Sequence, residues 1–305
     1  MNKPIQIFRN ISSISGSYDG ILLDAYGVFW NGNATGLIPG AKEMMQHLVA
    51  TGKIVGILSN STSSRLKEIN KLQNHGLLEG KHFHFLITSG ETAKFIFQNE
   101  ELPFRTPKKK FWVYCGDHPK FSSHQEIFQD TLYKETLEIG ESDFIYIATP
   151  HINGEDQTNP NLFQNEVERL RDSNLPMVCA NPDRFAHEGN PARAVVRPGS
   201  IAALYEKVGG EVFYIGKPFY KGYSLAMEQF KAYGVIHPEE VLMVGDTPET
   251  DIRGARMFGM GAALVIQTGI TADRIAENGI EAVLNHCQST DLPNFYIERL
   301  ASLLD

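Results

Sequence analysis

Short apolar runs alternate with longer segments of helical spacing along most of the chain. The runs are apolar throughout, as expected for strands that are covered on both faces of a parallel sheet. Four of them are "ILL" at 21–23, "IVGIL" at 54–58, "VFYI" at 212–215 and "VLMV" at 241–244. Helical spacing occurs from Ala41 to Leu48 and from Pro218 to Gly234. This rhythm predicts crossover connections and an α/β fold with a doubly wound, Rossmann-like parallel sheet.

The middle of the chain repeats the same rhythm on its own. Apolar runs occur at 111–114, 144–148 and 177–180, and the helical segment "NLFQNEVERLRD" lies between the last two. We interpret residues 90–180 as a second α/β domain inserted into the first. Residues 1–89 and 181–305 would then form the main domain, which contains the four runs named above.

Composition narrows the class of protein. The 305 residues are 42% hydrophobic and carry a formal net charge of -8, which argues against a nucleic-acid surface and offers no basic patch for a membrane. No apolar run is long enough to span a bilayer, and the amino-terminal segment has no convincing secretory signal. The three cysteines, Cys115, Cys179 and Cys287, form neither a disulfide framework nor a metal cluster. We therefore expect a cytoplasmic globular protein.

Polar residues follow each of the four main strands. Asp24 follows the first, and Ser59 and Asn60 end the second. Lys217 comes after the third, and Asp246 follows the fourth, with Asp251 five residues later. Because parallel strands deliver their carboxyl ends to one edge of a sheet, where such folds bind ligands, we expect these side chains to form one site.

The chemistry of this set suits phosphoryl transfer. A carboxylate such as Asp24 can attack phosphorus and form an aspartyl-phosphate, which divides one difficult displacement into two easier ones. Ser59 and Lys217 can hold the charged phosphoryl oxygens. Crowded carboxylates repel each other unless a cation lies among them, and hard oxygen ligands favour Mg²⁺.

Four stretches, in order, resemble the motifs of the haloacid dehalogenase (HAD) superfamily: "LLDAYGVFWNG", "GILSNST", "YIGKPFY" and "VGDTPETDIRGA". The insertion between the second and third motifs resembles the C2-type cap of subfamily IIA, which includes 4-nitrophenylphosphatase and UMP phosphatase-like enzymes. "PGAKEMMQHLVATGK" and "CANPDRFA" also resemble that branch. The resemblance runs from about residue 20 to 285.

This resemblance implies a role for each matching residue. Asp24 would be the nucleophile and a magnesium ligand, and Asp246 and Asp251 would bind the same ion. Ser59, with Asn60 beside it, would bind the phosphoryl group, and Lys217 would stabilise both nucleophile and phosphate. We also expect Asp183 and Arg184, from "NPDRF", to line the substrate pocket. The substrate would be a small phosphorylated metabolite, and the resemblance allows a homodimer through the cap.

Tyr26 departs from the family pattern. Phosphatases of this family carry a second aspartate here, which donates a proton to the leaving oxygen and contributes its backbone carbonyl to the magnesium ion. Tyr26 keeps the carbonyl, but a phenol with a reference pKa of about 10 can donate a proton and makes a poor base. Loss of a positioned acid–base typically costs about 10²- to 10⁴-fold in rate. The sequence therefore predicts a slow phosphatase that favours good leaving groups.

Two other readings of the sequence stay open. Tyr26 also fits a protein that binds a phosphorylated metabolite and retains only vestigial hydrolase activity. True 2-haloacid dehalogenases resemble this first motif too, but Asp246 and Asp251 would repel a substrate carboxylate. His151 and His187 could replace the missing acid, because histidine suits proton transfer near neutral pH, although a structural role is the simpler reading of each.

Overall fold

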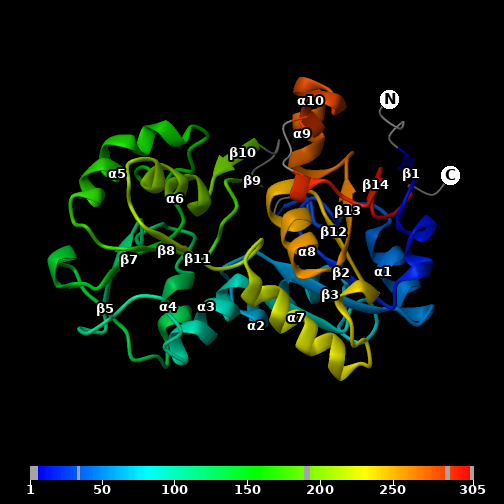
Figure 1. Ribbon diagram of the computed structural model, residues 1–305, viewed down its shortest axis with the longest axis horizontal. Helices are drawn as coiled ribbons and strands as arrows, with labels where there is room; N and C mark the ends of the chain where they lie inside the picture. The colour runs from blue at the N-terminus through cyan, green and yellow to red at the C-terminus, as the bar shows by residue number, and fades with distance from the viewer. Residues whose placement is uncertain (1–5, 33–34, 189–192, 286–288, 303–305) are drawn as a thin grey trace.

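The computed structural model describes residues 6–32, 35–188, 193–285 and 289–302. Within them the larger sheet is built from parallel strands, and Figure 1 shows it beside a second, smaller α/β lobe. Its spatial order is β1 (Ile7–Phe8), β14 (Phe295–Ile297), β13 (Gly261–Val265), β12 (Val241–Gly245), β2 (Gly20–Leu23), β3 (Ile54–Ser59) and β4 (Phe85–Thr88). The predicted α/β class is confirmed, and the runs at 21–23, 54–58 and 241–244 are strands of this sheet.

Helices cover both faces of the larger sheet. Because successive strand residues point to opposite faces, Ile21 and Leu23 pack in one core and Leu22 packs in the other. Helix α1 (Ala41–Ala50) contributes to the first core, and α7 (Tyr220–Ala232) and α8 (Arg253–Phe258) contribute to the second. Burial on both faces explains why these strands are apolar throughout.

The smaller lobe repeats this arrangement. Its parallel sheet has the order β11 (Val212–Tyr214), β8 (Met177–Cys179), β7 (Phe144–Ile147), β5 (Lys110–Tyr114) and β6 (Lys134–Glu135). One face packs against α3 (Ser89–Gln98) and α4 (Ser123–Phe128), and the other against α5 (Gln164–Arg171) and α6 (Pro198–Lys207). We call this sheet with helices α3 to α6 the smaller lobe.

The prediction from the sequence is wrong about the sheet to which one strand belongs. The run at 212–215 was assigned to the main domain, but β11 pairs in parallel with β8 in the smaller lobe. Ile215 N still donates to Cys179 O at 2.8 Å, and the chain turns back at Gly216, whose φ is +112°. An apolar run of three residues carries no information about which of two parallel sheets it joins. The expected return to the main domain at residue 181 therefore misplaces this strand.

Further elements complete the structure. A hairpin of β9 (Phe185–Glu188) and β10 (Arg193–Val196) precedes α6, and β9 contacts α9 (Gly269–Asn278) of the larger lobe. Helix α2 (Arg65–Asn74) follows β3, and α10 (Ile280–Asn285) follows α9. Among the described residues we find no helix with the length and apolar character needed to cross a bilayer.

Candidate active site

Three buried carboxylates meet at the carboxyl edge of the larger sheet. Asp24 directly follows β2, Asp246 directly follows β12, and Asp251 lies in the π-helical turn η6 (Pro248–Ile252). One oxygen from each lies within 4.8 Å of those of the others. Exposed fractions of 8%, 4% and 1% show that little water reaches these acids. The sequence-based expectation that these three residues share one site matches their positions.

Lys217 reaches this cluster from the smaller lobe. It follows β11 and the turn at Gly216, and only 2% of its surface is exposed. Its Nζ contacts Asp24 Oδ1 and lies 2.7 Å from Asp251 Oδ1. Burial alone would lower the pKa of Lys217, but Asp24 and Asp251 raise it above its ordinary value. The ammonium is therefore held charged between two acids.

The acids are not neutralised by Lys217 alone. Burial raises the pKa of Asp24 well above its ordinary value, with Lys217 opposing and Asp251 and Asp246 adding to the rise. Burial and the neighbouring Asp251 raise the pKa of Asp246 to about 7. Three buried carboxylates facing one ammonium favour a further positive charge. Their oxygen donors are of the kind that Mg²⁺ prefers, so the donor set fits a magnesium ion.

Two glycines make room for Asp246. A Cβ at Gly27 would lie 2.3 Å from Asp246 Oδ2, and a Cβ at Gly269 would lie 1.9 Å from the same atom. Both glycines have φ in the left-handed region, +75° and +73°. Ile270 N donates to Asp246 Oδ2 at 2.7 Å. The glycines therefore allow the start of α9 to approach and orient this carboxylate, which the sequence motifs alone did not indicate.

Asn60 connects the two lobes at the site. Its Oδ1 accepts from Lys217 N at 2.7 Å, and its Nδ2 donates to Lys217 O at 3.2 Å and to Asp183 Oδ1 at 2.8 Å. With 3% of its surface exposed, this side chain is fully committed to protein partners. Its geometry is that of a positioning residue, whereas the sequence suggested a phosphate contact. Ser59, also buried, lines the cavity beside Asp24 and accepts from Ser61 N at 3.2 Å.

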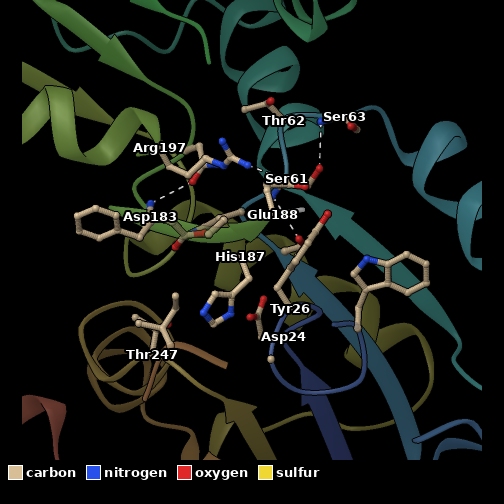
Figure 2. A pocket seen from close by; sticks show the side chains of 18 of the residues that line it. Asp24, Tyr26, Ser61, Thr62, Ser63, Asp183, His187, Glu188, Arg197 and Thr247 are labelled. Carbon is tan, nitrogen blue, oxygen red and sulfur yellow. Dashed lines mark hydrogen bonds and ion pairs between the residues drawn. The ribbon is translucent and has the colours of Figure 1, made fainter. Parts of the chain in front are cut away.

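A cavity of about 250 Å³ opens above the carboxylates, between the two lobes. Figure 2 shows Asp24 and Tyr26 on the side of the larger lobe, with Glu188 and Arg197 on the side of the smaller lobe. Several lining residues were not singled out as site residues from the sequence. They include Glu68 and Lys71 from α2, Glu188 from β9, and Arg197 at the start of α6.

Tyr26 lines this cavity, and its side chain is a phenol where family phosphatases carry a carboxylate. Burial raises the pKa of its phenol above the ordinary value, with Lys71 opposing and Glu68 and Glu188 adding to the rise. The hydroxyl is therefore protonated at neutral pH, so it can donate a proton and cannot act as a base. Lys71 Nζ lies 5.4 Å from the centroid of the Tyr26 ring.

The other predicted pocket residues divide between two cavities. Asp183 lines the cavity above Asp24, and burial raises the pKa of its carboxyl while Lys217 lowers it. Arg184 is exposed and lines a different cavity, so the structure does not bring it to Asp24. His187 lines the first cavity, and its Nε2 lies 2.5 Å from Asp273 Oδ2 on α9. His151 lies in the smaller lobe, 3.2 Å from Asp117, and is not among the residues lining this cavity.

Comparison with protein families identifies the class of protein to which this fold and site belong. A model described as haloacid dehalogenase-like hydrolase matches residues 21–125, and one described as HAD-hydrolase-like matches residues 214–292. These segments contain Asp24, Ser59 and Asn60 in the first case, and Lys217, Asp246 and Asp251 in the second. The chain belongs to the haloacid dehalogenase-like hydrolases.

Individual proteins are similar to this chain over most of its length. A 4-nitrophenylphosphatase from Schizosaccharomyces pombe is 23% identical over 100% of this chain and 99% of its own length. The structure of a haloacid dehalogenase-like hydrolase from Brucella suis covers 96% of this chain and 99% of its own, with a TM-score of 0.76 and 22% identity. A glycerol phosphate phosphatase from Mycobacterium tuberculosis, solved with magnesium, covers 95% of this chain and 78% of its own, with a TM-score of 0.64 and 18% identity. At these identities the two structures establish the shared fold.

Proposed function

We propose that the protein is a Mg²⁺-dependent phosphatase that hydrolyses a small phosphorylated metabolite through an aspartyl-phosphate on Asp24. The observation that carries this proposal is the meeting of Asp24, Asp246 and Asp251 within 4.8 Å, with the Lys217 ammonium on Asp24. The similarity to a 4-nitrophenylphosphatase over nearly the full length of both proteins supports the same reaction class.

Each residue has a distinct task in this proposal. Asp24 supplies the attacking oxygen, and Lys217 holds its carboxylate and compensates the charge that gathers as the phosphoryl group approaches. Ser59 offers its hydroxyl to a phosphoryl oxygen. Asp24, Asp246, Asp251 and the Tyr26 carbonyl would hold the magnesium ion, which when bound would supply positive charge to the phosphoryl oxygens.

The position of Tyr26 supports a slow reaction. Its protonated phenol can donate a hydrogen bond, but no base stands where family phosphatases carry the second aspartate. Esters with poor leaving groups need the proton donor most, so alkyl phosphates should react more slowly than aryl or acyl phosphates. The cavity of about 250 Å³ supports a small substrate, since typical ligand pockets hold about 300–1,000 Å³.

Phosphate release from 4-nitrophenyl phosphate tests the proposal. We expect release with Mg²⁺, loss of release with EDTA, and loss in Asp24→Asn under both conditions. Asp172→Asn removes an exposed carboxylate of the smaller lobe and serves as the matched control, with activity like that of the wild type. Release that ignores EDTA, or an Asp24→Asn enzyme as active as its parent, would contradict the mechanism.

A second candidate is favoured by Tyr26: a protein that binds a phosphorylated metabolite and scarcely turns it over. The same assay separates the two, because such a protein releases phosphate stoichiometrically and then stops. The dehalogenase reading has less support, since Asp246 and Asp251 are buried beside Asp24, where a substrate carboxylate would add a further negative charge. A homodimer and a cytoplasmic location stay predictions from the sequence.

A further inference from the structure

Two partly buried ion pairs line the cavity beside the three carboxylates. On the larger lobe, Lys71 pairs with Glu68, and their side chains are only 24% and 12% exposed. Ser61 Oγ donates to Glu68 Oε1 at 2.9 Å, which fixes this carboxylate. Lys71 Nζ also lies 5.4 Å from the ring centroid of Tyr26 and 5.0 Å from that of Trp30. The pair is therefore held in place on the cavity wall.

The second pair faces the cavity from the smaller lobe. Arg197 Nη2 lies 2.8 Å from Glu188 Oε1, and Arg197 Nη1 lies 3.2 Å from Asp156 Oδ1. The Arg197 side chain is 8% exposed, and its guanidinium carbon lies 5.9 Å from the centroid of the Phe121 ring. Glu188, Arg197 and Phe121 all line the cavity.

Tyr26 lines the same cavity as these two pairs, and Lys71 Nζ lies 5.4 Å from the centroid of its ring. The charged groups that act on its pKa are those of Lys71, Glu68, Glu188 and Arg197. Figure 2 shows Tyr26 beside Asp24, with Glu188 and Arg197 on the side toward the smaller lobe. Asp24 lines this cavity too, so a phosphoryl group bound there would direct its leaving group into the space that Tyr26 and the two pairs line.

We propose that Glu68 and Lys71, with Glu188 and Arg197 opposite them, form a leaving-group subsite that selects an uncharged, polyhydroxylated chain such as that of a sugar-alcohol phosphate. This inference rests on the proposed phosphatase function and names its substrate class. Because carboxylates only accept hydrogen bonds and the cations only donate them, a hydroxyl group can satisfy both members of a pair at once.

Other leaving groups fit this subsite less well. An anionic group would meet the carboxylates of Glu68 and Glu188, and the cations beside them are already paired, Lys71 with Glu68 and Arg197 with Glu188 and Asp156. An apolar chain would remove water from both ion pairs and return no hydrogen bond, which costs free energy. The aromatic side chains of Tyr26, Trp30 and Phe121 offer apolar surface for the carbon backbone of a polyol.

Three phosphate esters with the same four-carbon chain test the subsite: erythritol 4-phosphate, butyl phosphate and erythronate 4-phosphate. We expect the wild-type kcat/KM for the erythritol ester to exceed the other two by about 10-fold or more, because hydrogen bonds to charged groups discriminate on this scale. Lys71→Met and the isosteric Glu68→Gln should lower kcat/KM for the erythritol ester about 10-fold and leave butyl phosphate within about 2-fold. Lys231→Met, which removes an exposed lysine of α7, is the matched control.

The outcomes separate this inference from the proposed function. Equal losses on all three esters would show that the pair is merely structural, and a wild-type preference for the butyl or the erythronate ester would also overturn the subsite. In each of these cases Mg²⁺-dependent turnover of 4-nitrophenyl phosphate would leave the phosphatase function standing. Absence of turnover on every ester, 4-nitrophenyl phosphate included, would overturn the proposed function and the subsite with it.

Discussion

Replacing Asn60 by alanine tests how the smaller lobe delivers Lys217 to the site. The substitution removes the amide that bridges Lys217 N and O to Asp183. Among the described residues, Asn60 is the hydrogen-bond partner of both the buried Lys217 N–H and the Asp183 carboxylate. The variant therefore removes the hydrogen bonds that position the backbone of Lys217 and leaves Asp24 unchanged.

The magnitude follows from the bonds lost. An unsatisfied buried N–H costs about 1–3 kcal/mol, and a lost hydrogen bond to a charged group costs about 1.5–3 kcal/mol. Because water can partly replace the bond to the half-buried Asp183, we expect a loss of about 3 kcal/mol in the free energy of unfolding. Misplacing a catalytic group by about 1 Å can cost 10²-fold in rate, so kcat should fall about 100-fold.

Urea denaturation and steady-state kinetics with 4-nitrophenyl phosphate measure both effects. Asn70→Ala, at an exposed position of α2, is the matched control and should change neither quantity. If Asn60→Ala is folded and retains the wild-type kcat, then Lys217 is positioned without this bridge and our account of the site is wrong.

Three further predictions concern the acid–base position, the metal site and pH. Tyr26→Asp should raise kcat on an alkyl phosphate, by up to about 10²-fold, because it restores a group that can act as acid and base; an unchanged or lower rate in the folded variant would count against this. Gly269→Ala should weaken Mg²⁺ binding about 10-fold, measured by calorimetry, since its Cβ would displace the Asp246 carboxylate; Gly52→Ala, with φ of +85° and open space around its Cβ, controls for backbone strain. Without metal, the folded state keeps a proton on Asp246 up to a pKa of about 7, whereas the unfolded chain releases it near the ordinary 3.8. Stability should therefore fall as pH rises through this window, and Mg²⁺ should raise the melting temperature more at pH 8 than at pH 5; equal shifts at both pH values would contradict the charge crowding.

Much of the fold could be predicted from the sequence because local pattern and burial agree. The strands around Asp24, Ser59 and Asp246 are covered on both faces, so their apolar runs stand out between helical segments. The strand at 212–214 could not be placed, because its pairing with β8 depends on contacts with residues far away in sequence. The sequence indicated Lys217 as a site residue. Because the strand before it was assigned to the larger sheet, the sequence did not indicate that Lys217 reaches the site from the smaller lobe.

The catalytic constellation was easier to predict than the substrate pocket. Asp24, Asp246 and Asp251 follow a rule of parallel sheets, in which polar groups gather at the carboxyl edge. Glu68 and Lys71 show no such signal, since a charged pair at this spacing on a helix is typical of a solvent-exposed face. Contacts with Ser61, Tyr26 and Trp30 partly bury that pair in the folded protein, and the local sequence around Glu68 and Lys71 does not indicate these contacts. The same holds for Arg197, which is buried and forms ion pairs with Glu188 and Asp156.

The most direct measurement is detection of the covalent intermediate. Rapid quenching of the enzyme with Mg²⁺ and a reactive aryl phosphate, followed by peptide mass spectrometry, locates any phosphoryl group on the chain. We predict a single modification on Asp24, absent when EDTA is present and absent in Asp24→Asn. Steady phosphate release without a modified Asp24 peptide, or with the phosphoryl group on another residue, would contradict the central claim that Asp24 is the nucleophile.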